Sequence, residues 1–162
     1  MSGEGGAAWV FGENIDTDQL APGGTLKGSI EEIAKHCLVR VNPSFASEVK
    51  PGDFVVGGRN FGIGSSREQA AQALHHHGVA AVIAPSFGGI FYRNALNFGL
   101  LVVECPDAGR IGEGDRLTLD PVKGEVKNLT NGESYACQPV PAHLLEIVEA
   151  GGLVPYLEAI RS

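Results

Sequence analysis

The 162-residue sequence contains no apolar run long enough to span a membrane, so no membrane-spanning helix is expected. Residues 1–6 are polar and lack a basic segment, so no secretory signal peptide is visible. Basic residues are few, 12 against 19 acidic ones, and the net charge of −7 argues against binding to nucleic acid or to an anionic membrane. These absences make a cytoplasmic protein the expectation.

Cysteine is also scarce. The three cysteines, Cys37, Cys105 and Cys137, lie far apart and form no CxxC pair, which is typical of reduced thiols. Zinc and iron–sulfur sites usually take ligands that are closely spaced in the sequence, so we expect this chain to bind no metal ion and no cofactor of its own. The length predicts a single domain over residues 1–162 with a sizeable core.

Glycine, in contrast, is abundant, and four of the 23 glycines lie within residues 57–64. An apolar run before them, 54–56, predicts a buried strand, and the alanine-rich segment 70–74 after them predicts a helix. Glycine lets the connecting backbone turn tightly and approach a ligand closely. Ser65 and Glu68 have the spacing of a capping box, which predicts that the helix begins at this point.

This strand-to-helix turn has the groups of an anion site. A helix start presents unpaired N–H groups and the positive end of a dipole. Arg67 adds a planar fork that can bind a carboxylate with two hydrogen bonds, and Ser65 and Ser66 add hydroxyls. In the simpler alternative, Ser65 only caps the helix and Arg67 pairs with a surface carboxylate. That alternative does not explain why so many glycines precede the cap.

Two other glycine-rich sites fit the sequence poorly. Residues 62–67 begin like a dinucleotide-binding fingerprint but end in arginine, and no acidic residue stands about twenty positions later to bind a ribose. The hydrolase elbow GxSxG is absent because Arg67 occupies the last glycine position. Ser65 could instead act as a base, if the amides and Arg67 stabilise its alkoxide. Elimination of water would then need a Lewis acid, which a partner protein is expected to bring.

The order of the predicted elements favours an α/β fold with a parallel βαβαβ core, because fully apolar strands alternate with helices that end at glycines. Alternating segments after residue 116, with Asn131-Gly132 between the last two, predict a C-terminal antiparallel hairpin region. The predicted strands of the first part are 7–11, 54–56, 79–84 and 100–103, and the predicted helices are 29–38, 65–78, 90–98, 141–150 and a short one capped by Asn42.

Three motifs resemble one known family. Residues 58–70, GRNFGIGSSREQA, closely resemble a signature of the swivelling domain of the aconitase superfamily. Residues 14–23, NIDTDQLAPG, are similar to that family's N-terminal signature, and residues 91–95, FYRNA, also resemble it in the right order. The resemblance extends from Trp9 to about Ile147, and the length is similar to that of the free-standing small subunits of isopropylmalate-type dehydratases.

The resemblance implies a swivelling β/β/α domain that closes over a large subunit, whose own cysteines carry a [4Fe-4S] cluster. It implies that Ser65 is the catalytic base, that Ser66 and Arg67 bind a substrate carboxylate, and that Asp18 supports the site from its loop. The implied reaction is the reversible dehydration and rehydration of a malate-type di- or tricarboxylate, which moves a hydroxyl between adjacent carbons, as in leucine biosynthesis.

Two departures from the family pattern bear on the substrate. Residue 63 is Ile where isopropylmalate enzymes often have Cys, and residues 23–27 lack the arginine that aconitase-like members use for a further carboxylate. Either Lys27 replaces that arginine, or the substrate carries an apolar group, which favours isopropylmalate or dimethylmalate over citrate or homocitrate. The alternatives are a related hydro-lyase for dimethylmalate, homoaconitate or citraconate/methylmalate, and a non-catalytic module that binds a carboxylate or a nucleotide.

Overall fold

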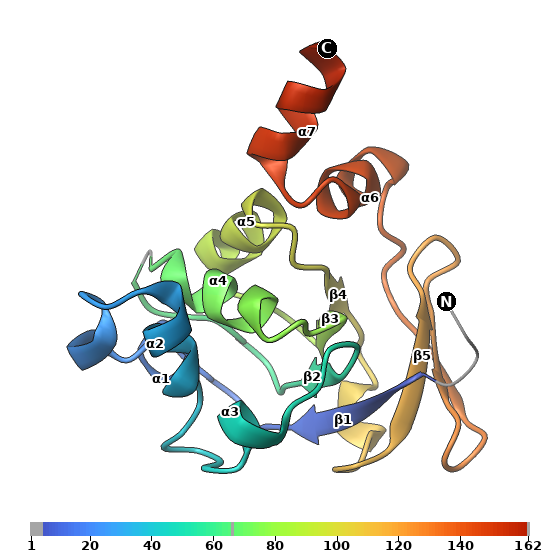
Figure 1. Cartoon of the computed structure of the whole chain (residues 1–162). Coiled ribbons are helices and arrows are strands. Elements are labelled where there is room, and N and C mark those ends of the chain that lie inside the picture. The colour runs from blue at the N-terminus through green and yellow to red at the C-terminus, as the bar shows by residue number, and fades with distance from the viewer. Residues whose placement is uncertain (1–4, 66, 162) are drawn as a thin grey trace.

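The computed structural model describes residues 5–65 and 67–161 (Figure 1). Within these residues one seven-stranded sheet has the strand order β4-β3-β2-β1-β5-β6-β7. Neighbouring strands from β4 to β1 are parallel, and those from β1 to β7 are antiparallel. The strands are β1 (Gly6–Val10), β2 (Phe54–Val56), β3 (Ala81–Ala84), β4 (Val102–Glu104), β5 (Arg116–Asp120), β6 (Glu125–Asn128) and β7 (Ser134–Ala136).

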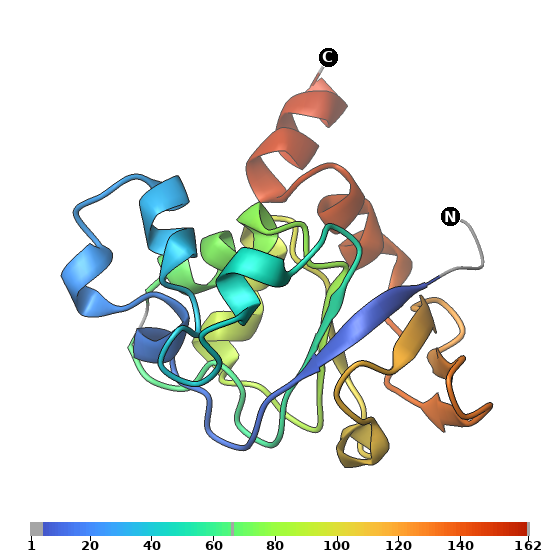
Figure 2. The same ribbon diagram turned by 60° about the horizontal axis from the view of Figure 1, so that its bottom comes forward.

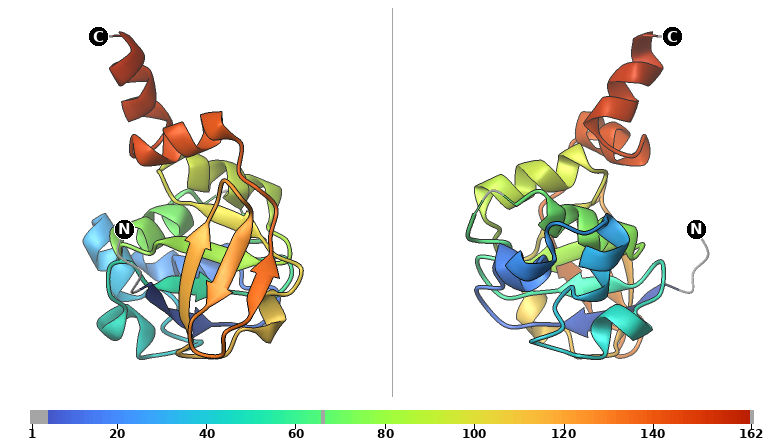
Figure 3. Two further views of the ribbon diagram at one scale, coloured as in Figure 1. Left: turned by 90° about the vertical axis from the view of Figure 1, so that its right-hand side faces the viewer. Right: turned by 60° about the vertical axis from the view of Figure 1, so that its left-hand side comes forward.

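Three layers make up the fold, which confirms the predicted α/β class and its βαβαβ core. Helices α4 (Gln69–His76) and α5 (Gly89–Asn97) connect β2 to β3 and β3 to β4, and they lie on one face of the parallel strands (Figure 1). Strands β5 to β7 cross the other face, because the sheet curls over on itself (Figure 3). Helix, parallel strands and antiparallel strands therefore stack as a β/β/α arrangement.

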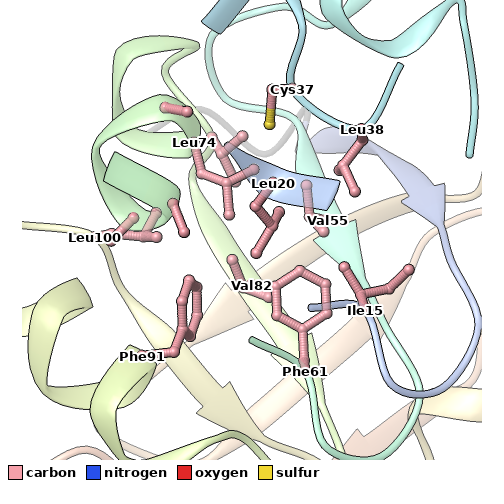
Figure 4. Close-up of a cluster of buried hydrophobic side chains, with 14 of the residues drawn as sticks. Ile15, Leu20, Cys37, Leu38, Val55, Phe61, Leu74, Val82, Phe91 and Leu100 are labelled. Atoms are coloured by element: carbon pink, nitrogen blue, oxygen red, sulfur yellow. The ribbon is translucent and has the colours of Figure 1, made fainter. Parts of the chain in front are cut away.

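Each face of the parallel strands has its own apolar core, because successive residues of a strand point to opposite faces. In β2, Val55 joins the core beneath the helices, whereas Phe54 and Val56 join the core beneath β5 to β7. The first core also contains Leu20, Leu74 and other fully buried side chains, as Figure 4 shows. This burial on both faces explains why the parallel strands read as continuous apolar runs.

The remaining helices are α1 (Thr17–Leu20), α2 (Ile30–Lys35), α3 (Phe45–Glu48), α6 (Ala142–Glu149) and α7 (Leu153–Arg161), with 3-10 helices η1 (Gly23–Thr25) and η2 (Ala108–Arg110). Helix α6 and the glycine stop after α5 agree with prediction. Helix α7, which projects from the body, was not predicted (Figure 2). No helix of the described residues is long and apolar enough to cross a membrane.

Two predicted helix boundaries are wrong. Ser29 caps α2 as expected, since its Oγ accepts the N–H of Glu32, but the helix ends at Lys35. Leu38, the predicted end, instead has a left-handed φ of 59°. The helix expected to begin just after Asn42 begins at Phe45, because the Asn42 side chain accepts the N–H of Ser44 and forms a turn before the helix.

Candidate active site

The loops that follow β1, β2 and β3 run side by side beyond the carboxyl ends of the strands. Four backbone hydrogen bonds join the first two loops: Gly58 N–H to Gly12 O (3.0 Å), Asn14 N–H to Arg59 O (2.9 Å), Gly62 N–H to Ile15 O (2.6 Å) and Thr17 N–H to Ile63 O (2.9 Å). On the other side, Phe61 donates to Ser86 O and accepts from Gly88 N–H. These hydrogen bonds therefore hold the first two family-like motifs, and the loop just before the third motif, together in one surface.

Two asparagines shape the adjoining loops. Asn14 and Asn60 both have a left-handed backbone, with φ of 59° and 61°, a conformation that asparagine tolerates better than most residues. Their side chains meet, because Asn60 Nδ2 donates to Asn14 Oδ1 over 3.1 Å. Next to them, Arg59 Nε donates to Glu13 Oε2 over 3.0 Å. These contacts fix the entry of both motifs into the site.

The glycines of the motif are needed by its geometry. Gly62 has φ of +83°, and a Cβ on it would overlap the ring of Phe91. Gly64 has φ of +115°, and a Cβ on it would lie 2.9 Å from Thr17 Oγ1. Side chains at either position would therefore be strained by the backbone and blocked by a neighbour.

Helix α1 lies inside the N-terminal motif, residues 14–23, where no helix was predicted. Asp16 caps it, since Asp16 Oδ1 accepts the N–H of Gln19 (2.8 Å) and Gln19 Oε1 accepts the N–H of Asp16 (2.9 Å). Asp16 therefore has a structural role as the helix cap. The capped turn places Asp18 on the outer surface while Leu20 is buried beneath it.

Asp18 and Arg67 form the polar centre of the site. Arg67 Nη1 donates to Asp18 Oδ1 over 2.7 Å and to the carbonyl of Ala21 over 3.1 Å. The same Oδ1 accepts the N–H of Gly23 over 3.0 Å, and Arg40 Nη1 lies 3.7 Å from Oδ2. The hydrogen bond from Arg67, followed by that from Gly23, lowers the pKa of Asp18 below its ordinary value. Asp18 therefore stays ionised and holds the guanidinium in place.

Ser65 lies two residues before Arg67 on the same surface loop. Its side chain is exposed, and its Oγ lies 3.4 Å from Oγ1 of the buried Thr17, the first residue of α1. The structure thus brings together Ser65 and Arg67, on the motif loop, and Asp18, in α1, and hydrogen bonds join this loop to α1. Lys27, after η1, is exposed, and it makes no hydrogen bond or ion pair with the described part of the chain. Ser66 lies outside the described residues.

The capping box predicted for Ser65 and Glu68 is wrong. Helix α4 begins at Gln69, and its N-cap residue, Glu68, makes no side-chain capping hydrogen bond. The hydroxyl of Ser65 instead faces Thr17, because the Ile63 carbonyl ties this loop to α1. The candidate site is therefore built on the Ser65 hydroxyl and the Arg67 guanidinium and not on a helix capped by Ser65.

Sequence reasoning missed two residues of the site. Thr17 stands inside the N-terminal motif, next to Asp18, but it was not identified as a site residue. Its place in the motif was the signal that could have identified it. Arg40 carries no motif at all and reaches Asp18 from the turn that follows α2. Its contact with the site is a result of folding alone.

The cysteines lie away from the site and in apolar surroundings. Burial raises the pKa of Cys37 and Cys105, and it raises the pKa of Cys137 to about 11, so all three thiols are protonated at neutral pH. A thiol must be ionised to bind a metal well. Among the described residues, no three His, Cys, Asp or Glu side chains are grouped so that they could hold a metal ion.

Comparison with known proteins gives consistent matches. Residues 41–108 match the aconitase C-terminal domain family. The chain is 50% identical over 157 residues to 3-isopropylmalate dehydratase small subunit 1 of Archaeoglobus fulgidus, covering 96% of this chain and 98% of the relative. It is 49% identical over 158 residues to the methanogen homoaconitase small subunit of Methanothermobacter thermautotrophicus, covering 96% and 91%. The crystal structure of a 3-isopropylmalate dehydratase from Methanocaldococcus jannaschii matches with a TM-score of 0.91 and 41% identity, covering 96% and 93%.

Proposed function

This chain belongs to the family of 3-isopropylmalate dehydratase small subunits, and we propose that it completes a hydro-lyase that interconverts 2- and 3-isopropylmalate in leucine biosynthesis. Members of this family are small subunits, so they work with a large subunit. The observation that supports the proposal most is the position of Ser65, which is exposed, stands two residues before Arg67 and contacts Thr17, the neighbour of Asp18 in the sequence. Because these groups lie on an open surface, a second protein is able to close the site over them.

Arg67 is the proposed binder of a substrate carboxylate. Both hydrogen bonds that it makes to described residues leave from Nη1, to Asp18 and to Ala21. Nη2 and Nε make no hydrogen bond to a described residue. They are proposed to bind the substrate, since they form the side of the guanidinium that binds a carboxylate with two parallel hydrogen bonds. The Arg67 side chain is 27% exposed, so it is held in place but accessible. Ser66 is proposed to add a hydroxyl to the same carboxylate.

Ser65 is the proposed base. Its Oγ takes a proton from the carbon next to the bound carboxylate during dehydration, and its hydroxyl returns that proton to the neighbouring position during rehydration. To act as the base, Ser65 must carry a negative charge. When a partner excludes water, the attraction between this charge and the nearby guanidinium of Arg67 acts in a less polar medium and becomes stronger.

We assign the iron–sulfur cluster to the large subunit. The cysteines of this chain do not fit such a cluster, since no three His, Cys, Asp or Glu side chains of the described residues are grouped so that they could hold a metal ion. When bound, a [4Fe-4S] cluster supplies a Lewis acid for removal of the substrate hydroxyl. The groups that this chain contributes bind the carboxylate, orient it and move the proton.

A homoaconitate-type tricarboxylate is the second candidate substrate. The guanidinium of Arg40 lies beside Asp18, so two arginines flank one carboxylate, and the exposed Lys27 follows η1. This positive charge suits a substrate with one more carboxylate. An apolar substrate group would gain nothing from it, and the relative from Methanothermobacter is named a homoaconitase small subunit.

The test is reconstitution with a large subunit. The chain is co-expressed with an iron–sulfur large subunit from the same genome, and the purified complex is assayed for hydration of unsaturated diacids by loss of their ultraviolet absorbance. Turnover is expected with isopropylmaleate, the unsaturated intermediate between the two isopropylmalates, and a homoaconitate preference would select the second candidate. A chain that binds nucleotide by itself, and forms no complex, would contradict the proposal and favour a binding module.

A further inference from the structure

Thr17 is a buried polar residue whose side chain faces the active site. Its exposed fraction is 3%, and among the described residues the other buried polar side chains are Asp53 and Asn128. Each of those two accepts or donates several hydrogen bonds that join strands and turns. Within the part of the chain that the structure describes, the hydroxyl of Thr17 makes one side-chain hydrogen bond instead, with Oγ of Ser65 at 3.4 Å.

The backbone fixes this pair of hydroxyls. Thr17 N–H donates to the carbonyl of Ile63 over 2.9 Å, and its own carbonyl accepts the N–H of Ala21 within α1. Between Ile63 and Ser65 stands Gly64, where a Cβ would lie 2.9 Å from Thr17 Oγ1. The loop therefore passes close over Thr17, and the missing side chain at Gly64 leaves space for the hydroxyl beneath Ser65.

A purely structural role does not account for the hydroxyl. A buried hydroxyl loses its hydrogen bonds to water, and this costs free energy unless a protein partner replaces them. Valine has nearly the same shape as threonine and would fill the same buried space without that cost. The Thr17 hydroxyl stabilises its partner most when the partner oxygen carries a charge, because a hydrogen bond to a charged oxygen is about twice as strong as a neutral one.

We propose that Thr17 is a positioning residue that orients the Ser65 hydroxyl and donates a hydrogen bond to its oxygen when that oxygen is ionised, an inference that rests on the proposed function of Ser65 as the base. The Ser65 alkoxide receives the proton from the substrate carbon and becomes a hydroxyl, and the electron pair of the broken C–H bond stays on the substrate. The proton of Thr17 remains on Thr17 throughout. Thr17 contacts neither the substrate nor the departing water.

The activity test compares Thr17→Val with Thr17→Ser in the reconstituted complex. Thr17→Val removes the donor and is expected to lower kcat by about tenfold or more with little change in KM, as for the loss of one donor to an oxyanion. Thr17→Ser keeps the donor and is expected to retain most of the wild-type kcat. Equal losses in both variants would assign Thr17 to packing alone and overturn the proposal, as would wild-type kcat in Thr17→Val. Association with the large subunit and thermal unfolding show that each variant is folded.

A second test needs no catalysis. Ser65→Cys places a thiol on the exposed loop, whereas the three native cysteines are buried, so iodoacetamide reports on the new thiol selectively. Its pKa, from the pH dependence of alkylation, is expected to be higher in Ser65→Cys/Thr17→Val than in Ser65→Cys, because the donor to the thiolate is gone. The same pKa in both would overturn the proposal. If the wild-type complex hydrates no diacid, the proposed function fails, and the thiol comparison still decides whether Thr17 supports an anion at this position.

Discussion

Arg67 donates a 2.7 Å hydrogen bond from Nη1 to Oδ1 of Asp18, and this bond joins two sequence motifs through residues that are 49 positions apart. It fixes the plane of the guanidinium, since the Ala21 carbonyl accepts a second bond from the same nitrogen. Because Nη1 is occupied in this way, the free edge of the guanidinium has one direction in which to bind a carboxylate. The activity proposed for the chain depends on this orientation.

Arg67→Lys tests the guanidinium. An ammonium is a point charge and cannot bind Asp18 and a substrate carboxylate with a planar fork. We expect a higher KM and a lower kcat, with kcat/KM reduced on the order of a hundredfold. Steady-state kinetics of the reconstituted complex measure this. Arg110→Lys is the matched control. Arg110 Nη2 lies 3.5 Å from Oε2 of Glu133, and this pair is not part of the site, so the substitution should leave the kinetics unchanged. Wild-type kinetics in Arg67→Lys would make Arg67 a structural residue.

Asp18→Asn tests the carboxylate that orients Arg67. The hydrogen bond from Arg67 lowers the pKa of Asp18, so the ion pair is fully present above the ordinary aspartate pKa of about 3.9 and is lost as the pH falls through the lowered value. We expect KM to rise on the order of tenfold in Asp18→Asn at every pH between about 5 and 8, since the charge-assisted bond is gone throughout. A variant that differs from wild type at one end of this range only would show that Asp18 titrates there and would contradict the lowered pKa.

Gly62→Ala tests the conformation of the motif loop. At φ of +83°, with the Phe91 ring against the position of the missing Cβ, alanine is strained and has no space. The free energy of unfolding, from urea denaturation, is expected to fall by about 1–3 kcal/mol. In the control, Gly89→Ala at the start of α5, a Cβ would meet no atom within 4 Å, and stability should be equal or higher. Equal effects of the two substitutions would mean that the loop is not held in this conformation.

Much of the fold could be predicted because the parallel strands are buried on both faces. Their apolar runs, with Gly78 and Gly99 ending the helices between them, determine the βαβαβ order from local sequence alone. Helix α1 could not be predicted in this way, because four residues are too short for a helical period. Helix α7 was missed although Leu153, Leu157 and Ile160 have the spacing of one helix face, and these side chains are exposed and not part of either core.

The sequence predicted which residues belong to the candidate site better than it predicted the contacts between them. Ser65, Arg67 and Asp18 stand in motifs, and the family resemblance places them in one site, but no spacing rule connects positions 49 apart. The wrong capping box shows the limit of local patterns. Ser65 and Glu68 have the right spacing, yet a long-range partner, Thr17, is the contact of Ser65. Arg40 reaches Asp18 only through the packing of α2 against the helices around it.

His77 gives a prediction about pH and stability. Its Nε2 lies 2.8 Å from the carbonyl of Ala34, and burial lowers its pKa below the ordinary value. The unfolded chain therefore binds a proton more readily than the folded one near pH 6, so stability is full above about pH 7 and falls as the pH drops through the ordinary histidine pKa of about 6.5. Urea denaturation at about pH 7 and at pH values below about 6.5 should show this loss of stability. The substitution His77→Gln, which keeps a donor for the Ala34 carbonyl, should make the loss of stability smaller. His143→Gln, at an exposed position of α6, is the control and should keep the wild-type dependence.

The most direct test of the whole account is Ser65→Ala in the reconstituted complex. Ser65 is exposed, so its replacement removes one hydroxyl and little packing. The complex should form as in wild type, and Ser134→Ala, at an exposed position of β7, should be fully active. Hydration of the unsaturated diacid, followed by loss of its ultraviolet absorbance, is predicted to fall by at least about a thousandfold in Ser65→Ala, as for removal of a base. A Ser65→Ala complex that hydrates the diacid at the wild-type rate would contradict the central claim.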